Sequence, residues 1–208
     1  MRHIIDIHHD GGGAWAPQVR GDEHYRFRLS LQWDRGPVLG VVGLYPTPGA
    51  VRRWDAGLWR LGRIAKSWGY AGLAIANLNA RIVESSDELA NADDPVGPGN
   101  DDELRQLAAE HEFVLLAWGE QAEPARACSV AAQLWRELTT HGGALGVLGW
   151  AANGQPCALA RGRTAPIVPH SLTAGAHPGF VDVDQHWANL FCGATYSPAA
   201  GVGGGRYA

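Results

Sequence analysis

Several features are scarce or missing in this sequence, and each absence narrows the class of protein. There are only three cysteines, Cys128, Cys157 and Cys192, and their spacing fits neither a disulfide framework nor a redox pair. No apolar run approaches the roughly 20 residues that cross a bilayer. An acid, Asp6, precedes any apolar stretch, so we expect no signal peptide. These absences favour a cytoplasmic protein that makes no membrane contact.

Common phosphate-binding and nucleophile motifs are missing as well. The glycine-rich run Gly201–Gly205 follows no predicted strand and opens no predicted helix, so it is not a Walker or dinucleotide loop. No serine stands on a nucleophile elbow followed by an acid and a histidine. We therefore expect no cofactor.

Lysine is nearly absent, since 16 of the 17 basic residues are arginine, and the net charge is −4. This balance excludes a protein coated with basic surface. The charge is uneven, however. Residues 1–81 carry 11 basic against 6 acidic residues, whereas residues 82–137 carry 3 against 13.

What the sequence does contain is a repeated alternation of apolar runs and helical patterns. Among its 208 residues, 46% are hydrophobic, which suffices for one domain with a sizeable core. The helical patterns include one that begins at Asn100, where Glu103 three residues later resembles a capping box. The predicted buried strands are Val38–Leu44, Leu73–Ala76, Phe113–Ala117 and Ala144–Leu148, and the other predicted helices are Val51–Trp68 and Ala125–Thr139.

This pattern predicts an α/β fold, a three-layer sandwich around a small, mostly parallel sheet. With the buried strands numbered in chain order, we expect the core order 2-1-3-4. The stretch Tyr25–Trp33 alternates apolar and polar residues, which predicts one added, half-buried antiparallel strand beside Val38–Leu44. We expect an N-terminal extension over 1–22, the α/β domain over 23–169 and an irregular, Gly/Pro/Ala-rich C-terminal extension over 170–208, packed on the domain or on a partner subunit of a homo-oligomer.

In an open α/β sheet, ligands bind outside the carboxyl ends of the strands, where the strand order reverses. The turn Tyr45–Gly49 and the segment Trp118–Glu120 would face each other there, with the end of Leu73–Ala76 beside them. Tyr45 and Trp118 could stack on a planar base. Structural roles remain open, with Trp118 capping the core and Asn77 satisfying loop backbone. The predicted ligand-binding residues are Tyr45, Thr47, Asn77, Arg81, Trp118 and Glu120.

An anion site is also predicted on the helix that follows the turn, opposite its apolar stripe. Its residues are Arg52, Arg53, Arg60 and Arg63. Catalytic groups cannot be assigned. Glu120 or the pair Asp93 and Asp94 could act with Asn77, but adjacent aspartates in a loop are typical of loop capping.

The order and spacing of several short motifs resemble a bacterial and phage family catalogued as domain of unknown function 1643. The motifs, within residues 23–169, are Tyr25–Trp33, Pro46-Thr47, Trp68–Leu73, Asn77-Leu78, Asp94–Pro98, Asn100-Asp101, Ala117–Gly119 and Gly154–Pro156. The resemblance implies a strand order similar to that of uracil-DNA glycosylases, and with it recognition of a nucleobase, a nucleotide or a nucleic-acid strand, with glycosylase-like hydrolysis as an extension. The chain departs from the family where Tyr45 replaces an asparagine and Cys157 replaces a histidine.

Two other functions stay open. One is a metal-dependent hydrolase, in which a divalent metal binds terminal histidines and acids. The other is a non-catalytic binding or subunit-interaction module whose pocket is filled by Tyr45 and Pro48. The candidate metal ligands are His8, His9, His170, His177, Asp182 and His186.

Overall fold

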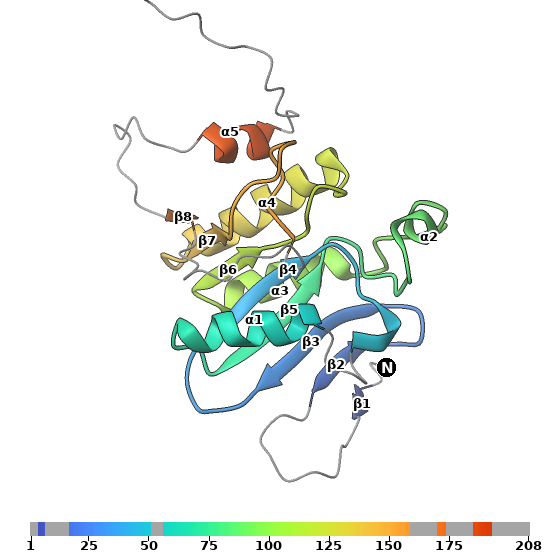
Figure 1. The fold of residues 1–208 in the computed structure, drawn as a ribbon, viewed down its shortest axis with the longest axis horizontal. Helices are drawn as coiled ribbons and strands as arrows, with labels where there is room; N and C mark the ends of the chain where they lie inside the picture. Colours follow the sequence, from blue (N-terminus) through green and yellow to red (C-terminus); the bar gives the residue numbers. More distant parts are fainter. Residues whose placement is uncertain (1–3, 7–16, 51–55, 159–169, 174–184, 193–208) are drawn as a thin grey trace, which may run out of the picture.

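In the computed structural model, the described part of the chain consists of residues 4–6, 17–50, 56–158, 170–173 and 185–192. It forms one eight-stranded mixed sheet with the order β1-β2-β3-β5-β4-β6-β7-β8 (Figure 1). The strands are β1 (Ile4–Asp6), β2 (Gln18–Gly21), β3 (Arg26–Gln32), β4 (Val38–Gly43), β5 (Gly72–Asn77), β6 (Phe113–Leu116), β7 (Ala144–Val147) and β8 (His170–Thr173). The helices are α1 (Ala56–Ser67), α2 (Ser86–Ala90), α3 (Asn100–Glu110), α4 (Pro124–Thr139) and α5 (Gln185–Cys192), with a short 3-10 turn at Pro48–Ala50.

The parallel part of the sheet is the run β5-β4-β6-β7, built from the four predicted buried strands. β4 lies at its centre because its residues are apolar on both faces, and Leu39, Val41 and Val42 are fully buried. The order of the whole sheet differs from the predicted one. Four antiparallel strands, not one, flank the parallel run: β1, β2 and β3 on one side and β8 on the other.

The position of β3 corrects a second expectation. It pairs antiparallel with β5, not with the strand that follows it in the chain, because both edges of β4 are occupied by β5 and β6. It is also more than half-buried. The charged side of its alternating pattern, Arg26 and Arg28, is nearly inaccessible to solvent. Alternation indicated one polar face, but α3 covers that face and supplies partners for Arg28.

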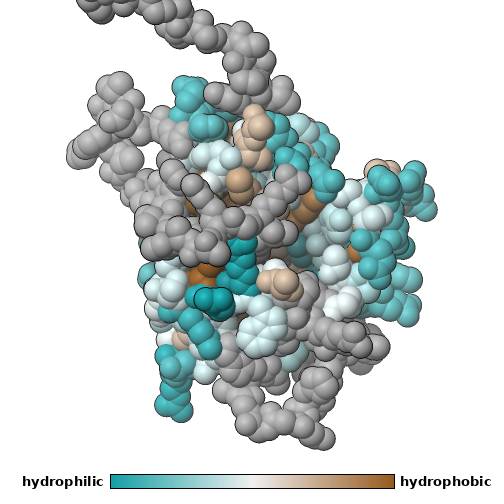
Figure 2. All heavy atoms as spheres, in the orientation of Figure 1, coloured by the Kyte–Doolittle hydropathy of each residue, from teal (hydrophilic) through white to brown (hydrophobic). Residues whose placement is uncertain are grey.

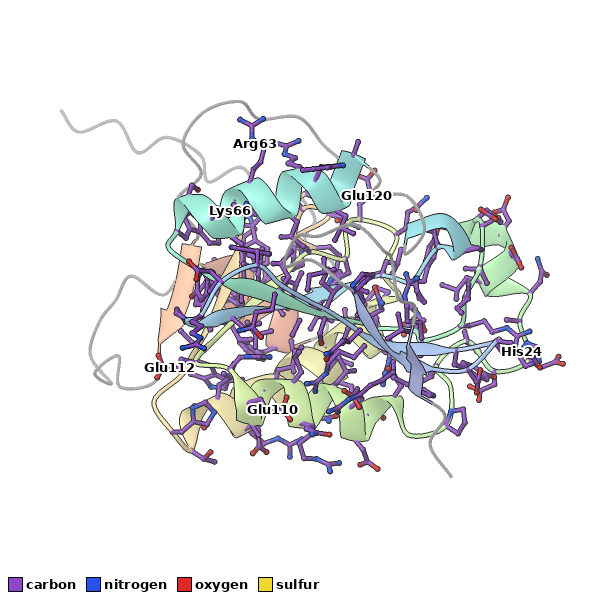
Figure 3. All side chains as sticks on the ribbon, turned by 90° about the horizontal axis from the view of Figure 1, so that it is seen from below. His24, Arg63, Lys66, Glu110, Glu112 and Glu120 are labelled. Atoms are coloured by element: carbon purple, nitrogen blue, oxygen red, sulfur yellow. The ribbon has the colours of Figure 1, made fainter. Side chains whose placement is uncertain are left out.

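Helices cover both faces of the sheet, as the three-layer prediction requires. Figure 3 shows α1 above the sheet and α3 below it. The α1 face packs Leu58 and Leu61 on Leu73, and the opposite face packs Leu104 and Leu134 of α3 and α4 on the other side of the strands. The connection from β4 to β5 runs in the opposite direction to that from β5 to β6, so right-handed crossovers place α1 and α3 on opposite faces. The strand order therefore reverses between β4 and β6.

The predicted first helix is observed as α1, and residues 51–55 lie outside the described part. Its stripe of Leu58, Leu61 and Ala65 is buried as expected. Arg63 extends away from the sheet (Figure 3), whereas the ammonium of Lys66 lies over the ring of Trp33, 5.5 Å from its centroid. None of the helices in the described ranges combines the length and the apolar character that crossing a bilayer requires.

The start of α3 does not use the expected capping box. The N-cap residue is Gly99, at φ 83°, and no side chain caps the helix. Asn100 and Glu103 both point elsewhere: the amide of Asn100 donates to the end of β5, and Glu103 pairs with Arg28. Two residues with the spacing of a cap thus serve long-range contacts.

Parts of both predicted extensions contribute to the same sheet and core. β2 pairs with β3, and β8 pairs with β7. In α5, Trp187 and Leu190 are buried in the α4 side of the core. The domain boundaries at 22 and 169, and any homo-oligomer formed through residues 170–208, stay predictions.

Candidate functional site

A pocket of about 350 Å³ opens at the carboxyl edge of the parallel strands, between α1 and the sheet. Strands β3, β4 and β5 form its floor, α1 forms one wall, and the loops after β4 and β6 form the rim. Its described lining residues are Arg26, Leu29, Val41, Gly43, Leu44, Tyr45, Thr47, Gly57, Leu58, Leu61, Ile75, Asn77, Ala117, Trp118, Gln121 and Ala158. Most of these residues are apolar and a few are polar, as in a typical small-molecule site.

Asn77, the last residue of β5, is the most informative polar group in the pocket. It is 6% exposed and lines the cavity, yet its side-chain amide makes no hydrogen bond to any residue in the described part of the chain. Neither amide atom belongs to the fully enclosed side-chain atoms that lack a partner in the described residues, so the amide is accessible from the open space of the pocket. A structural asparagine would normally satisfy that amide with backbone groups of a neighbouring loop.

The neighbouring strand makes room for this side chain. Gly43, the last residue of β4, pairs with Asn77 across the ladder. A Cβ atom at position 43 would lie 2.7 Å from the Oδ1 atom of Asn77. Glycine is therefore required here if the amide is to keep its place over β4.

The backbone that follows the Asn77 side chain is held by one buried and one partly buried side chain, Asn100 and Arg126. The Nδ2 atom of Asn100 donates to the carbonyl oxygens of Asn77 and Leu78, each at 3.1 Å. Arg126 donates twice to the Leu78 carbonyl, from Nε at 3.0 Å and Nη2 at 2.8 Å. The carbonyls of Asn77 and Leu78 are thus fixed, while the side chain of Asn77 faces the open space of the pocket.

A short chain of polar groups links three segments at the rim. The hydroxyl groups of Tyr45 and Ser86 lie 3.3 Å apart, and Ser86 donates to the Oε1 atom of Gln121 at 2.8 Å. The contacts join the turn after β4, the first residue of α2 and the loop after β6. Figure 2 shows hydrophilic side chains over α2 at the edge of this face.

One known protein family matches the part of the chain that contains these elements. A family model described as "Protein of unknown function (DUF1643)" matches residues 26–157. The chain belongs to this family. Searches among curated proteins and among solved structures returned no match. The family match spans β3 to β7, and hence every described pocket residue except Ala158.

In this DUF1643 chain, four of the six predicted ligand-binding residues line one pocket. These are Tyr45, Thr47, Asn77 and Trp118. The indole of Trp118 is only 1% exposed, and its Nε1 atom donates to Gln155 at 2.8 Å. It therefore belongs to the core as well as to the pocket wall, which leaves little of its ring for stacking.

The other two predicted ligand residues are not among the lining residues. The guanidinium of Arg81 lies over the ring of Tyr25, 5.4 Å from its centroid. Glu120 is exposed, and its backbone carbonyl accepts a hydrogen bond from Asn153. Asp94 caps its own loop through a hydrogen bond from the Gly97 N–H, as the loop-capping interpretation expects.

The predicted anion face is only partly described. Arg52 and Arg53 lie outside the described residues, while Arg60 is half-buried and Arg63 is exposed on α1. The sequence interpretation missed Arg26, which lines the pocket and donates from Nη1 to the Thr47 carbonyl at 3.2 Å. Its position in an alternating strand assigned it to the solvent side, so the pattern pointed away from it.

The alternative metal site falls mostly outside the described residues. That holds for His8, His9, His177 and Asp182, and for the side chain of His170 in β8. The ring of His186 stacks on Trp150, with centroids 5.2 Å apart. Within the described ranges, no three His, Cys, Asp or Glu side chains are grouped so that they could hold a metal ion.

Proposed function

We propose that this pocket binds a small ligand with a planar nucleobase, such as a nucleoside or nucleotide. The observation that carries the proposal is the side-chain amide of Asn77, a residue 6% exposed, which lines a cavity of about 350 Å³ and makes no hydrogen bond within the described part of the chain. A side-chain amide presents a donor and an acceptor next to each other, and base edges offer the complementary pair. Binding such a ligand would satisfy the amide.

The remaining walls support a flat ligand. Leu29, Val41 and Ile75 project from the sheet on the α1 side, and Leu58 and Leu61 oppose them from α1. These side chains belong to one apolar cluster, and an apolar lining of this kind favours a ligand with an apolar, planar ring system, because it buries the surface of the ring. Tyr45 adds an aromatic group to the lining, and its hydroxyl lies 3.3 Å from that of Ser86.

Glycosylase-like hydrolysis remains an extension of this proposal. It needs a group that positions water and a donor for the leaving base. Among the described lining residues there is no Asp, Glu or His, and Arg26 is the single charged residue. The contacts at the pocket therefore support recognition more directly than turnover, and the likeness to uracil-DNA glycosylases stays an architectural hypothesis.

Isothermal titration with a panel of free nucleosides and their 5′-monophosphates tests the proposal. We expect at least one member to bind, and Asn77→Ala to weaken its binding by about 5- to 150-fold, the equivalent of about 1–3 kcal/mol for a bidentate base contact. The matched control is Asn79→Ala. Asn79 is partly buried two residues further along the chain, but it does not line the pocket.

Two outcomes would contradict the proposal. One is that no nucleoside or nucleotide binds at millimolar concentration. The other is that Asn77→Ala and Asn79→Ala weaken binding equally, which would show that the amide at position 77 makes no specific contact. Released free base, measured by chromatography in the same samples, would separate hydrolysis from binding alone.

A further inference from the structure

The peptide between Asn77 and Leu78 is held from two sides. On the β4 side, the N–H of Leu78 donates to the Gly43 carbonyl at 2.9 Å. On the opposite side, Asn100 donates to the carbonyls of both Asn77 and Leu78. The backbone that carries the Asn77 amide is therefore fixed by groups from β4 and α3.

Asn100 is an unusual residue for this position. It is fully buried, and while its Nδ2 atom donates twice, its Oδ1 atom has no hydrogen-bond partner in the described part of the chain. The first turn of a helix does not require a buried asparagine, and an unsatisfied buried acceptor is costly. The contact that offsets this cost is the double donation to the end of β5.

Arg126 strengthens the same contact from α4. Both its Nε and Nη2 atoms donate to the Leu78 carbonyl, and Nη2 also pairs with the carboxylate of Asp101 at 2.6 Å. A guanidinium held by a carboxylate has a fixed plane, so its two donors define the direction of that carbonyl. Asn100 of α3 and Arg126 of α4 thus converge on the Leu78 carbonyl, one residue after Asn77.

We propose that Asn100 is a positioning residue that acts through Asn77. It holds the Asn77 carbonyl, and together with Arg126 it holds the Leu78 carbonyl; the two residues thereby fix the backbone after β5 and aim the Asn77 amide into the pocket, over the space left by Gly43. What the amide recognises rests on the proposed function, but the positioning itself concerns only this chain and can be measured without a ligand.

The ligand-free test follows the side-chain NH₂ signals of Asn77 by ¹⁵N NMR, assigned by their loss in Asn77→Ala. In the unaltered protein we expect one narrow pair of signals. In Asn100→Ser and in Arg126→Gln we expect the pair to broaden or split, because the peptide loses its donors. Asn91→Ser is the control, since Asn91 donates to the backbone of Asp87 in α2, away from the pocket.

An unchanged Asn77 pair in both variants would overturn the proposal. Arg126→Gln keeps the test decisive if Asn100→Ser does not fold, because the Arg126 side chain is partly exposed and its loss is less severe. Unaltered signals in that variant alone, with Asn100→Ser unfolded, would also overturn the proposal, because Asn100 and Arg126 are proposed to hold the Leu78 carbonyl together.

Binding supplies a second, independent measurement. The probes are uridine and the other nucleosides of the panel. We expect Asn100→Ser alone to bind several-fold more weakly than the unaltered protein, and the double variant Asn77→Ala/Asn100→Ser to bind as Asn77→Ala does. An equal loss in both backgrounds would show a general structural effect and contradict the proposal. If no nucleoside binds the unaltered protein, the proposed function fails, and the NMR result still decides the positioning.

Discussion

Arg26 and Arg28 stand two residues apart on β3, both are nearly inaccessible to solvent, and their surroundings differ sharply. Arg28 is 4% exposed and forms ion pairs with Glu103 and Glu110 of α3. Arg26 is 6% exposed, donates to the Thr47 carbonyl and lines the pocket. One arginine is enclosed by carboxylates from its own chain, and the other stands at a cavity.

The same contrast separates Asn100 and Asn77. The amide of Asn100 uses both of its N–H groups within the fold, whereas the described part of the chain offers the Asn77 amide no partner. Burial alone therefore does not show whether the described part of the chain satisfies a polar group. The useful distinction is whether the chain satisfies the group or leaves it facing an open volume.

The largest effect is expected where the ion pairs are broken. Arg28→Met should lower the free energy of unfolding by about 3–5 kcal/mol, because it leaves the buried carboxylate of Glu103 without its closest cation. Urea denaturation followed by circular dichroism measures this change. The control is Arg105→Met, which removes an exposed pair with Asp102 and should cost less than about 1 kcal/mol.

A second variant checks the cause. In Arg28→Met combined with Glu103→Leu, the uncompensated charge is gone, and we expect much of the lost stability to return. If the double variant is no more stable than Arg28→Met alone, the contact between Arg28 and Glu103 is not what stabilises this face, and the contrast with the pocket is weaker.

The next effect differs between the two asparagines. Asn77→Leu should change the free energy of unfolding by less than about 1 kcal/mol, since the described part of the chain gives its amide no hydrogen bond that the substitution would remove. Asn100→Leu should lower it by about 1–3 kcal/mol, because two hydrogen bonds are lost. A clear loss of stability in Asn77→Leu would indicate that the Asn77 amide is structural.

The parallel core could be predicted from the sequence, and the flanking strands could not. The runs at β4, β5, β6 and β7 are apolar on both faces, a pattern that specifies strands buried between helices. The sequence pattern of β3 shows alternation, but nothing in that alternation reveals that α3 covers its charged side. Strand pairing beyond the core depends on which edges are free, and that is a property of the assembled sheet.

For the site, the carboxyl edge and Asn77 followed from topology, while Arg26, Ser86 and Gln121 did not. Ser86 and Gln121 carry no local signal, and they meet only because α2 folds back on the loop after β6. The sequence around Asn100 and Glu103 carried a misleading local signal. Their spacing is typical of a helix cap, yet tertiary contacts with β5 and Arg28 took precedence over the local pattern.

Two glycines of β4 extend the comparison within a single strand. Gly43→Ala should change stability by less than about 1 kcal/mol, because a new Cβ atom meets only the movable amide of Asn77 and alanine suits a strand better than glycine. Nucleoside binding should weaken as in Asn77→Ala. At Gly40 a Cβ atom would crowd Val114 and the backbone of Phe113, so Gly40→Ala should destabilise the fold. Equal effects of the two variants on both measurements would contradict this division.

The smallest expected effect concerns pH on the ion-paired face. Burial lowers the pKa of His111 below its usual 6.5, and the charge of Arg28 lowers it further, although Glu110 opposes the shift. Protonation thus favours the unfolded chain, so the stability contributed by neutral His111 is complete above pH 6.5 and declines as the pH falls toward the folded-state pKa. The pKa of Glu110 is also lowered: burial would raise it, but hydrogen bonds from Arg28 and Gln106 outweigh that effect, so its contribution to stability is lost only in more acidic solution.

Between pH 7.5 and pH 5.5, His111→Leu should therefore lose less thermal stability than the unaltered protein, and the difference should be smaller than the effects predicted above. The control is Asn77→Leu, which should show the pH dependence of the unaltered protein because Asn77 lies on the other side of the sheet. If His111→Leu loses as much stability over this range as the unaltered protein, the histidine is not the group that couples this face to pH.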